Sequence, residues 1–198
     1  MDADKKGKAR GGMRGTKTRD FAWRTLEIEH AAVKSLIDTL SADEMTRPDT
    51  IRYGLYADQE LSFKDLLAHL ICYEAYCLEA LNEWRAGRKH WIIDGFHSGR
   101  DDVRVHYEGI NVRRPHSLAT VLDEWQRTQA GLVAAIREMS DAEWNSPAPF
   151  ESAYALDLSG VFELILCPPP RPPYRHLPVH IPDPGAYVRK LRNGTQNA

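Results

Sequence analysis

The residues of this sequence with the clearest capacity for chemistry are three histidines, His69, His176 and His180. His69 lies in the segment SFKDLLAHLICYE, and the other two form an H-x-x-x-H pair in YRHLPVHIPD. Two histidines four residues apart on a helix project from one face, with Cβ atoms roughly 6 Å apart. A third histidine from a facing helix would complete a three-nitrogen metal site with one position open for water or substrate. A divalent ion held there can lower the pKa of bound water toward about 7 and make it a nucleophile.

The same histidines also have a structural interpretation, and the sequence leaves it open. Pro178 lies between the two members of the pair and disfavours helix at Leu177. In an extended segment four residues span about 13 Å, which is too far for one ion. The pair can share a metal only if a new helix begins near Pro173 and places Pro178 in its first turn. For His69, at the flank of an apolar stripe, and for His30, on a buried face, the alternative to a ligand is a hydrogen-bonded core histidine.

Three amphipathic segments are expected to position these side chains. Apolar residues recur at three- and four-residue spacing over about residues 19–40, which predicts a first helix. A second helix starts at the S-x-x-D capping box of Ser62 and Asp65 and ends near Gly87. A third helix starts near Ser117 and has the same apolar spacing. These segments indicate antiparallel helices packed around one core.

The fourth helical segment is interrupted. Residues 159–167 (SGVFELILC) are apolar and helical in character, but PPPRPP at 168–173 cannot continue an α-helix. No alternating pattern typical of β-strands competes with these helices, so all-α is the predicted class. LSADEMTRP at 40–48 and MSDAEWNSP at 139–147 share an apolar-S-x-x-E-apolar-x-x-P pattern. Each follows an amphipathic helix and is followed by a serine-led helical start, LSFKDLL at 61 or LSGVFELIL at 158, so we interpret them as the connections within two related helical hairpins.

Residues 89–116 form a charged connection with weak periodicity. We expect its histidines to be solvated, although a long connection can also act as a lid. Glutamates 74 and 79 of the second helix are expected to face solvent, with a role as bases left open. The histidines of the connection are His90, His97, His106 and His116.

Composition bounds the class of protein. The chain has 198 residues, 42% hydrophobic and 27% charged, which suits one soluble domain with a tail. No run approaches the roughly 18–20 apolar residues of a membrane helix, and no signal-peptide block precedes the first helix. Cys72, Cys77 and Cys167 form no C-x-x-C pair and are predicted to be buried free thiols. We therefore expect a cytoplasmic protein without a membrane partner.

The charge is concentrated at the N-terminus. Residues 1–19 hold seven Lys/Arg and two Asp, a net +5 that leaves −7 for the remainder of a chain of net charge −2. Their composition predicts a disordered basic tail, followed by a bundle over 20–192 and a flexible C-terminus at 193–198. A solvated tail and a nucleic-acid-binding arm remain alternatives, but the acidic body argues against nucleic acid as a partner.

Several segments resemble DinB-like four-helix-bundle proteins, with the greatest similarity to the ClbS/DfsB group. SFKDLLAHLICYEAYCLEAL resembles the second helix of that group, which has a capped start, D-L-L-A-H-L and an aromatic-acid pair. LIDTLSADEMTRP resembles the end of its first helix, and RPHSLATVLDEWQRTQAGLVAAIREMSDAEW resembles its third. YRHLPVHIPD is similar to its closing H-x-x-x-H-[LI]-P-D segment. The resemblance covers about residues 24–191 in family order, and PPPRPP departs from the continuous fourth helix of the family.

The resemblance implies a DinB/YfiT-like four-helix bundle, here with a basic N-terminal tail and an interrupted fourth helix. It implies that His69, His176 and His180 hold a divalent metal, zinc or nickel, in a homodimeric protein. The chemistry of the family is varied and includes thiol-dependent transfer, isomerisation and the hydrolysis of a reactive cyclopropane in a genotoxin. Fold alone therefore fixes neither substrate nor catalytic residues.

We predict a metal-dependent hydrolase or group transferase that acts on a small molecule, in a detoxification or self-protection role. The alternative is a metal-free bundle that binds a small molecule in an aromatic pocket between helices. A third hypothesis is nucleic-acid binding through the basic tail. The aromatic residues that could form either core or pocket are Trp23, Tyr73, Tyr76, Trp84 and Trp125.

Overall fold

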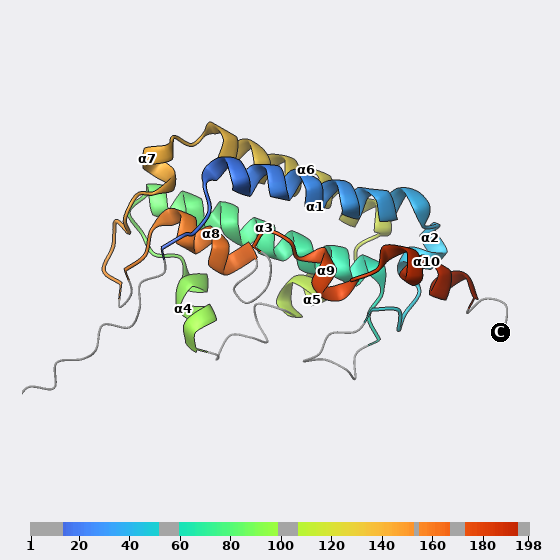
Figure 1. Cartoon of the computed structure of the whole chain (residues 1–198). Helices are drawn as coiled ribbons and strands as arrows, with labels where there is room; N and C mark the ends of the chain where they lie inside the picture. The colour runs from blue at the N-terminus through green and yellow to red at the C-terminus, as the bar shows by residue number, and fades with distance from the viewer. Residues whose placement is uncertain (1–13, 52–59, 99–106, 153–154, 167–172, 194–198) are drawn as a thin grey trace, which may run out of the picture.

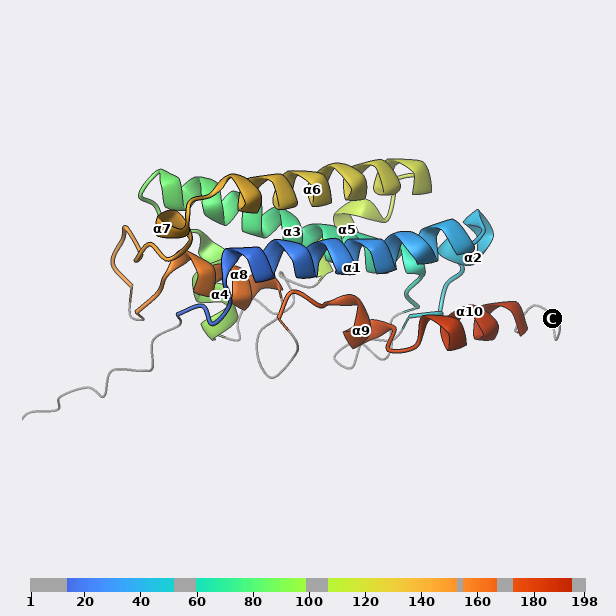
Figure 2. The same ribbon diagram turned by 45° about the horizontal axis from the view of Figure 1, so that its top comes forward.

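Three long helices and one shorter helix form the body of the molecule. The computed structural model describes residues 14–51, 60–98, 107–152, 155–166 and 173–193. The long helices are α1 (Arg19–Thr39), α3 (Phe63–Arg85) and α6 (Leu118–Glu138), and the shorter one is α8 (Leu158–Leu166). α3 packs against both α6 and α8, and α1 packs against α6 (Figures 1 and 2). The chain is therefore an all-α helical bundle, as predicted.

Short helices connect and cover the bundle. They are α2 (Ala42–Thr46), α4 (Trp91–Ser98), α5 (Gly109–Arg113), α7 (Asp141–Trp144), α9 (Leu177–His180) and α10 (Pro184–Asn193). Within the described residues the extended backbone pairs only as two isolated bridges, Ile51 with Leu61 and Pro147 with Asp157. No helix among the described residues is both long enough and apolar enough to cross a membrane.

Side-chain caps fix where the long helices begin. Ser62 and Asp65 form the predicted capping box of α3: the Ser62 amide donates to the Asp65 carboxylate at 2.8 Å, and the Asp65 amide donates to the Ser62 hydroxyl at 3.2 Å. Ser117 caps α6 by accepting from the Thr120 amide at 3.1 Å. These caps satisfy amides that have no partner within their own helix.

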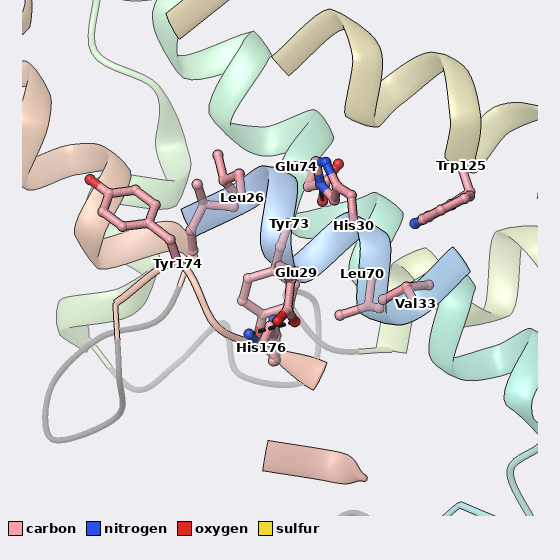
Figure 3. Close-up of a pocket in the computed structure, with 11 residues that line it drawn as sticks. Leu26, Glu29, His30, Val33, Leu70, Tyr73, Glu74, Trp125, Tyr174 and His176 are labelled. Carbon is pink, nitrogen blue, oxygen red and sulfur yellow. Dashed lines mark hydrogen bonds and ion pairs between the residues drawn. The ribbon is translucent and has the colours of Figure 1, made fainter. Parts of the chain in front are cut away.

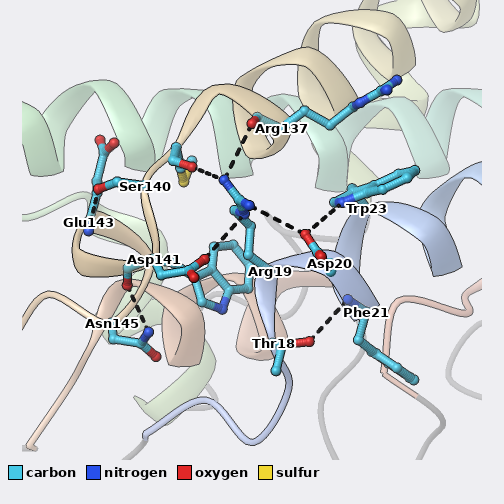
Figure 4. Close-up of polar contacts among 12 residues, drawn as sticks. Thr18, Arg19, Asp20, Phe21, Trp23, Arg137, Ser140, Asp141, Glu143 and Asn145 are labelled. Atoms are coloured by element: carbon cyan, nitrogen blue, oxygen red, sulfur yellow. Dashed lines mark hydrogen bonds and ion pairs between the residues drawn. The ribbon is translucent and has the colours of Figure 1, made fainter.

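The start of α1 is fastened to the end of α6 (Figure 4). Thr18 caps α1 by accepting from the Phe21 amide at 3.2 Å. Arg19 donates to the backbone carbonyl of Met139 and lies 3.4 Å from the carboxylate of Asp141. This contact holds the two antiparallel helices in register at one end of the bundle.

The two related hairpins predicted from the sequence have matching structures. Ser41 caps α2 and Ser140 caps α7, and the apolar residue four positions after each serine, Met45 or Trp144, is buried. Each short helix is followed by one of the isolated bridges and then by α3 or α8. The repeated sequence pattern therefore marks a repeated helix–turn–helix unit.

The apolar core consists of two clusters joined along α3, which contributes to both. One cluster includes Trp84, Trp144 and Phe162, and the other includes Trp125 and Leu177. Most of the aromatic residues noted in the sequence are thus core residues. Because α3 is covered by helices on several sides, its buried residues extend well beyond a single stripe.

The charged connection at 89–116 contains structure that its weak periodicity did not predict. α4 packs on α8 and α5 packs on α3. A Cβ at Gly109 would lie 2.5 Å from the Cβ of Cys72, so glycine permits this close approach of α5. His90 is buried beside Glu79, at 3.3 Å, so the prediction of a solvated side chain was wrong there. His116 is exposed as expected, and the His97 side chain and His106 lie outside the described residues.

Part of the predicted basic tail contacts the bundle. The amide of Gly15 donates to the Asp157 carboxylate at 2.8 Å, and the amides of Thr16 and Lys17 donate to Glu163 at 2.6 and 2.7 Å. Residues 1–13 and 194–198 lie outside the described residues, so the predictions of disorder at the two ends are not tested there.

α10 was not anticipated from the sequence. The Ala186 amide donates to the Asp183 side chain at 2.9 Å, and Pro184 occupies the first helical position. Proline is favoured at that position because its missing amide would have had no helical partner. The D-P-G sequence at 183–185 is the signal that could have predicted this helix.

Candidate metal centre

The structure brings His69, His176 and His180 together between α3 and α9. The Nε2 atoms of His69 and His176 lie 3.2 Å apart, and one ligating nitrogen from each of the three residues lies within 4.8 Å of the others. His69 and His176 are buried, and His180 is half-buried. Donors around a tetrahedral ion with bonds near 2.1 Å are roughly 3.4 Å apart. His69 and His176 already have about that spacing.

His69 lies in the first third of α3, two turns after the capping box of Ser62 and Asp65. The sequence left open whether this flanking residue is a structural histidine or a ligand. Its ring faces α9, with centroid distances of 4.8 Å to His176 and 5.1 Å to His180. The resemblance therefore identified three residues that the fold gathers, although His69 lies more than one hundred positions before the other two in the sequence.

After the proline-rich segment, the chain becomes helical again at α9, four residues later than the start near Pro173 that the sequence analysis required for a shared metal. The new helix begins at Leu177 rather than near Pro173, with His176 in the N-cap position and Pro178 in the first turn. Leu177 is helical despite the following proline because its side chain is 2% exposed and belongs to the apolar core. Cys167 and residues 168–172 lie outside the described residues, so the rest of the interruption is not described.

A left-handed residue turns the chain into this short helix. Tyr174 has φ of 60°, an uncommon backbone conformation for a residue with a side chain. Its ring is 1% exposed, and this burial offsets the conformational cost. Burial, and secondarily the charge of Glu163, raises the pKa of Tyr174 well above its ordinary value, so the phenol is neutral at physiological pH.

Tyr73 forms an aromatic wall of the cluster. Its ring lies edge-on to His69 and to His176, with both centroid distances 4.8 Å, and it is 3% exposed. The histidines are therefore held in a partly dehydrated environment, where interactions of a metal ion with charged or polar groups are stronger than in water.

Glu29 of α1 is the polar neighbour that the sequence analysis missed. Its carboxylate accepts from the amide of His176 at 2.9 Å and from the amide of Leu177, and it pairs with Arg175 at 3.0 Å. Glu29 is 4% exposed. A glutamate inside the apolar stripe that contains Leu26 is the signal that could have found it, since a buried carboxylate requires partners.

His30 and Glu74 form a second buried polar pair beside the cluster. His30 Nε2 lies 2.6 Å from Glu74 Oε1, and both side chains are less than 10% exposed. The alternative reading of His30 as a satisfied core histidine is confirmed. The expectation that Glu74 faces solvent was wrong, because α1 covers this face of α3, whereas Glu79 is exposed as expected.

A small, mostly apolar chamber lies between this pair and His176 (Figure 3). It has a volume of about 20 Å³, which is room for one water molecule, and its lining includes Glu29, His30, Tyr73, Trp125 and His176. Figure 3 shows the Trp125 indole nitrogen pointing into the space between α1 and α3. Nε1 of this residue has no hydrogen-bond partner among the described residues.

Three imidazole nitrogens are a donor set that suits a divalent transition metal. Imidazole binds zinc, copper, iron and nickel, and three protein ligands leave a position for a further group. The cluster could therefore hold a metal ion. Among the described residues, a search for groups of three or more potential metal ligands finds this cluster.

The architecture and the site define the class of the protein: an all-α helical bundle with a cluster of three histidines between its helices. Comparison with known proteins identifies the family. A model of the DinB superfamily matches residues 25–166, more than half of the chain. The chain therefore belongs to the DinB superfamily. The matched region includes His69 but ends before His176 and His180, so the closing ligand pair lies outside it.

Two solved structures show the same fold. An uncharacterised protein from Escherichia coli UTI89 matches with a TM-score of 0.65 at 12% identity, over 91% of this chain and 96% of that one. The colibactin self-resistance protein ClbS, solved in complex with double-stranded DNA, matches with a TM-score of 0.62 at 12% identity, over 91% and 97%. A search of curated protein sequences found no significant match.

Proposed function

We propose that this protein is a divalent-metal-dependent hydrolase or group transferase that acts on a small molecule in a detoxification or self-protection role. The observation that carries the proposal is the convergence of His69, His176 and His180, with all ligating nitrogens within 4.8 Å of one another. Membership of the DinB superfamily and the fold shared with a self-resistance protein support the biological role. Zinc or nickel is the proposed metal.

The residues around the cluster leave its solvent-facing side, near His180, available for a substrate. A bound divalent ion would supply Lewis acidity and activate water or a substrate thiol. The three histidines would hold it, and Tyr73 and the apolar core around Leu177 would keep bulk water from its inner side. His180 is the least buried of the three histidines, so we propose that the small-molecule substrate approaches from its side.

Metal analysis of purified, untagged protein tests the proposal. We expect close to one equivalent of zinc or nickel per chain and a large loss in His69→Ala, because this substitution removes a buried ligand. His116→Ala, which changes an exposed histidine, is the matched control and should retain the metal. Sub-stoichiometric metal in the parent protein, with no change in His69→Ala, would contradict the proposal.

A metal-free binding protein is the rival function. It predicts that chelators leave the melting temperature unchanged and that an apolar ligand raises it. The chamber beside the histidines, with its volume of about 20 Å³, is much smaller than the roughly 300–1,000 Å³ of a typical ligand site. This chamber therefore has no room for such a ligand. We also propose that the protein is a homodimer, which sedimentation analysis would test.

A further inference from the structure

We propose that Glu29 is the positioning residue of the metal centre: its carboxylate holds the start of α9 so that His176 and His180 face His69. This inference rests on the proposed metal-binding function, because the expected effect of Glu29 on metal affinity requires that the histidines bind a metal. Its structural basis, the contacts between α1 and α9, is independent of any metal.

α9 needs support from outside itself. It has four residues, and isolated helices shorter than about 12–15 residues are marginal in water. His176 occupies its N-cap position but makes no side-chain capping hydrogen bond, and Pro178 lies in its first turn. The segment that presents two of the three histidines therefore lacks the local capping that stabilises α3 and α6.

Glu29 supplies the missing cap from another helix. Its Oε1 accepts from the amides of His176 and Leu177, and its Oε2 accepts from Arg175 Nε. These bonds link residues 146 to 148 positions apart in the sequence, and hydrogen bonds to an ionised carboxylate are stronger than neutral ones. Because one of the bonds is to the amide of His176 itself, loss of the carboxylate would shift the imidazole that lies 3.2 Å from His69.

The same contacts make Glu29 a support rather than a ligand. Both carboxylate oxygens are engaged by α9 or by Arg175, and the metal-binding group found among the described residues contains histidines alone. Groups that orient metal ligands contribute about 10- to 100-fold to metal affinity in other proteins. Glu29 therefore fixes the geometry of the donor set without contributing a ligand atom.

Zinc affinity measured by competition with a chromophoric chelator tests the role. Glu29→Ala should weaken zinc binding about 10- to 100-fold. Glu29→Gln, whose amide oxygen can still accept from both backbone amides, should recover part of that loss. Glu27→Ala is the matched control, because Glu27 lies on the same helix but is exposed and pairs with Arg137 at 3.6 Å.

A general loss of stability must be separated from a positioning effect. Leu132→Ala removes a fully buried side chain of α6 and should lower the melting temperature without changing zinc affinity. In metal-free protein, the His176 and Leu177 amides should exchange with deuterium faster in Glu29→Ala than in Leu132→Ala. Equal exchange in these two variants, or unchanged zinc affinity in Glu29→Ala, would overturn the proposal. Failure of the parent protein to bind either zinc or nickel would contradict the proposed function, and the exchange measurement would still test the role of Glu29.

Discussion

Two glutamates on facing helices have roles that are set by their partners rather than by their residue type. Glu29 accepts hydrogen bonds from the backbone of α9, and Glu74 contacts a histidine of α1. Both are buried, and a buried carboxylate is stable only when its partners replace the lost hydration. The polar residues near the cluster therefore form a supporting layer between α1, α3 and α9.

The buried pair of His30 and Glu74 should be important for stability. In His30→Leu the Glu74 carboxylate loses its partner, and leaving a buried hydrogen-bonding group without its partner costs about 1–3 kcal/mol of unfolding free energy, or more for a charged group. Urea denaturation measures this cost. The double variant His30→Leu/Glu74→Leu should recover part of it, because no buried carboxylate then remains. A single variant as stable as the double variant would show that the pair contributes little.

At the level of single residues, the sequence identified the candidate metal ligands but not the buried glutamates that hold them in place. The spacing of His176 and His180, together with the resemblance, identified the cluster that the fold forms. Glu29 was not singled out and Glu74 was wrongly expected to face solvent, because a helical sequence does not say which neighbouring element covers a polar position. Their partners lie 44 to 148 residues away in the sequence.

Among the elements, α3 and α9 contrast in how they are stabilised. α3 has 23 residues, a capping box and buried residues on several sides, whereas α9 has four residues and depends on its neighbours. The histidine cluster thus combines one ligand on a long, capped helix with two at a four-residue helix that contacts with α1 hold in place. We expect changes in α1 and α9 to affect the cluster before changes in α3 do.

The capping box of α3 gives a prediction at this scale. Ser62→Ala removes the acceptor for the Asp65 amide, which should lower the unfolding free energy by about 1 kcal/mol. Thermal or urea unfolding measures the loss. Ser35→Ala, at an exposed position within α1, is the control and should be close to neutral. Equal effects of the two substitutions would show that the cap is not important for α3.

The long helices could be predicted because their signals are local. Apolar spacing and the serine caps located α1, α3 and α6 to within a residue or two. The short helices α4, α5 and α10 were missed, since their few turns give too little periodicity. The sequence required a helix around His176 and His180 for metal binding but could not predict one, because Pro178 disfavours helix at Leu177. The contacts that overcome this effect, burial of Leu177 and hydrogen bonds to Glu29, are tertiary and have no local pattern.

The molecule as a whole combines a helical hairpin that occurs twice with a C-terminal segment, α9 and α10, that occurs once among the described residues. α1 and α2 are matched by α6 and α7, but α9 and α10 have no counterpart in the first hairpin among the described residues. The bundle could be predicted from this repeat and from the resemblance. The placement of the closing segment could not, because it depends on long-range contacts.

Stability should fall at alkaline pH because several buried acids are held neutral. Burial raises the pKa of the Cys72 and Cys77 thiols and of the Tyr187 phenol. A group with a raised pKa in the folded state contributes stability that is complete below its unfolded pKa, about 8.5 for cysteine and 10 for tyrosine. That contribution is lost as the pH rises toward the folded value.

Urea unfolding between pH 7.5 and 10.5 measures this dependence. We expect the unfolding free energy to decline above about pH 8.5. Cys77→Ala should make the decline shallower, whatever its effect on absolute stability, since it removes one group that ionises only in the unfolded chain. A free energy independent of pH over this range would contradict the prediction.

The long separation between His69 and His176 also has a consequence for the order of events during synthesis. The two residues are 107 positions apart, and ribosomes add about 5–20 residues per second, so roughly 5–20 s pass between their translation. During that interval a growing chain carries only one of the three imidazoles. The cluster is completed only when residue 180 has left the ribosome and α9 has docked on α1. In the proposed metal-bound protein, loading of the ion would therefore require synthesis past residue 180, and copies terminated before His176 would carry only one of the three ligands.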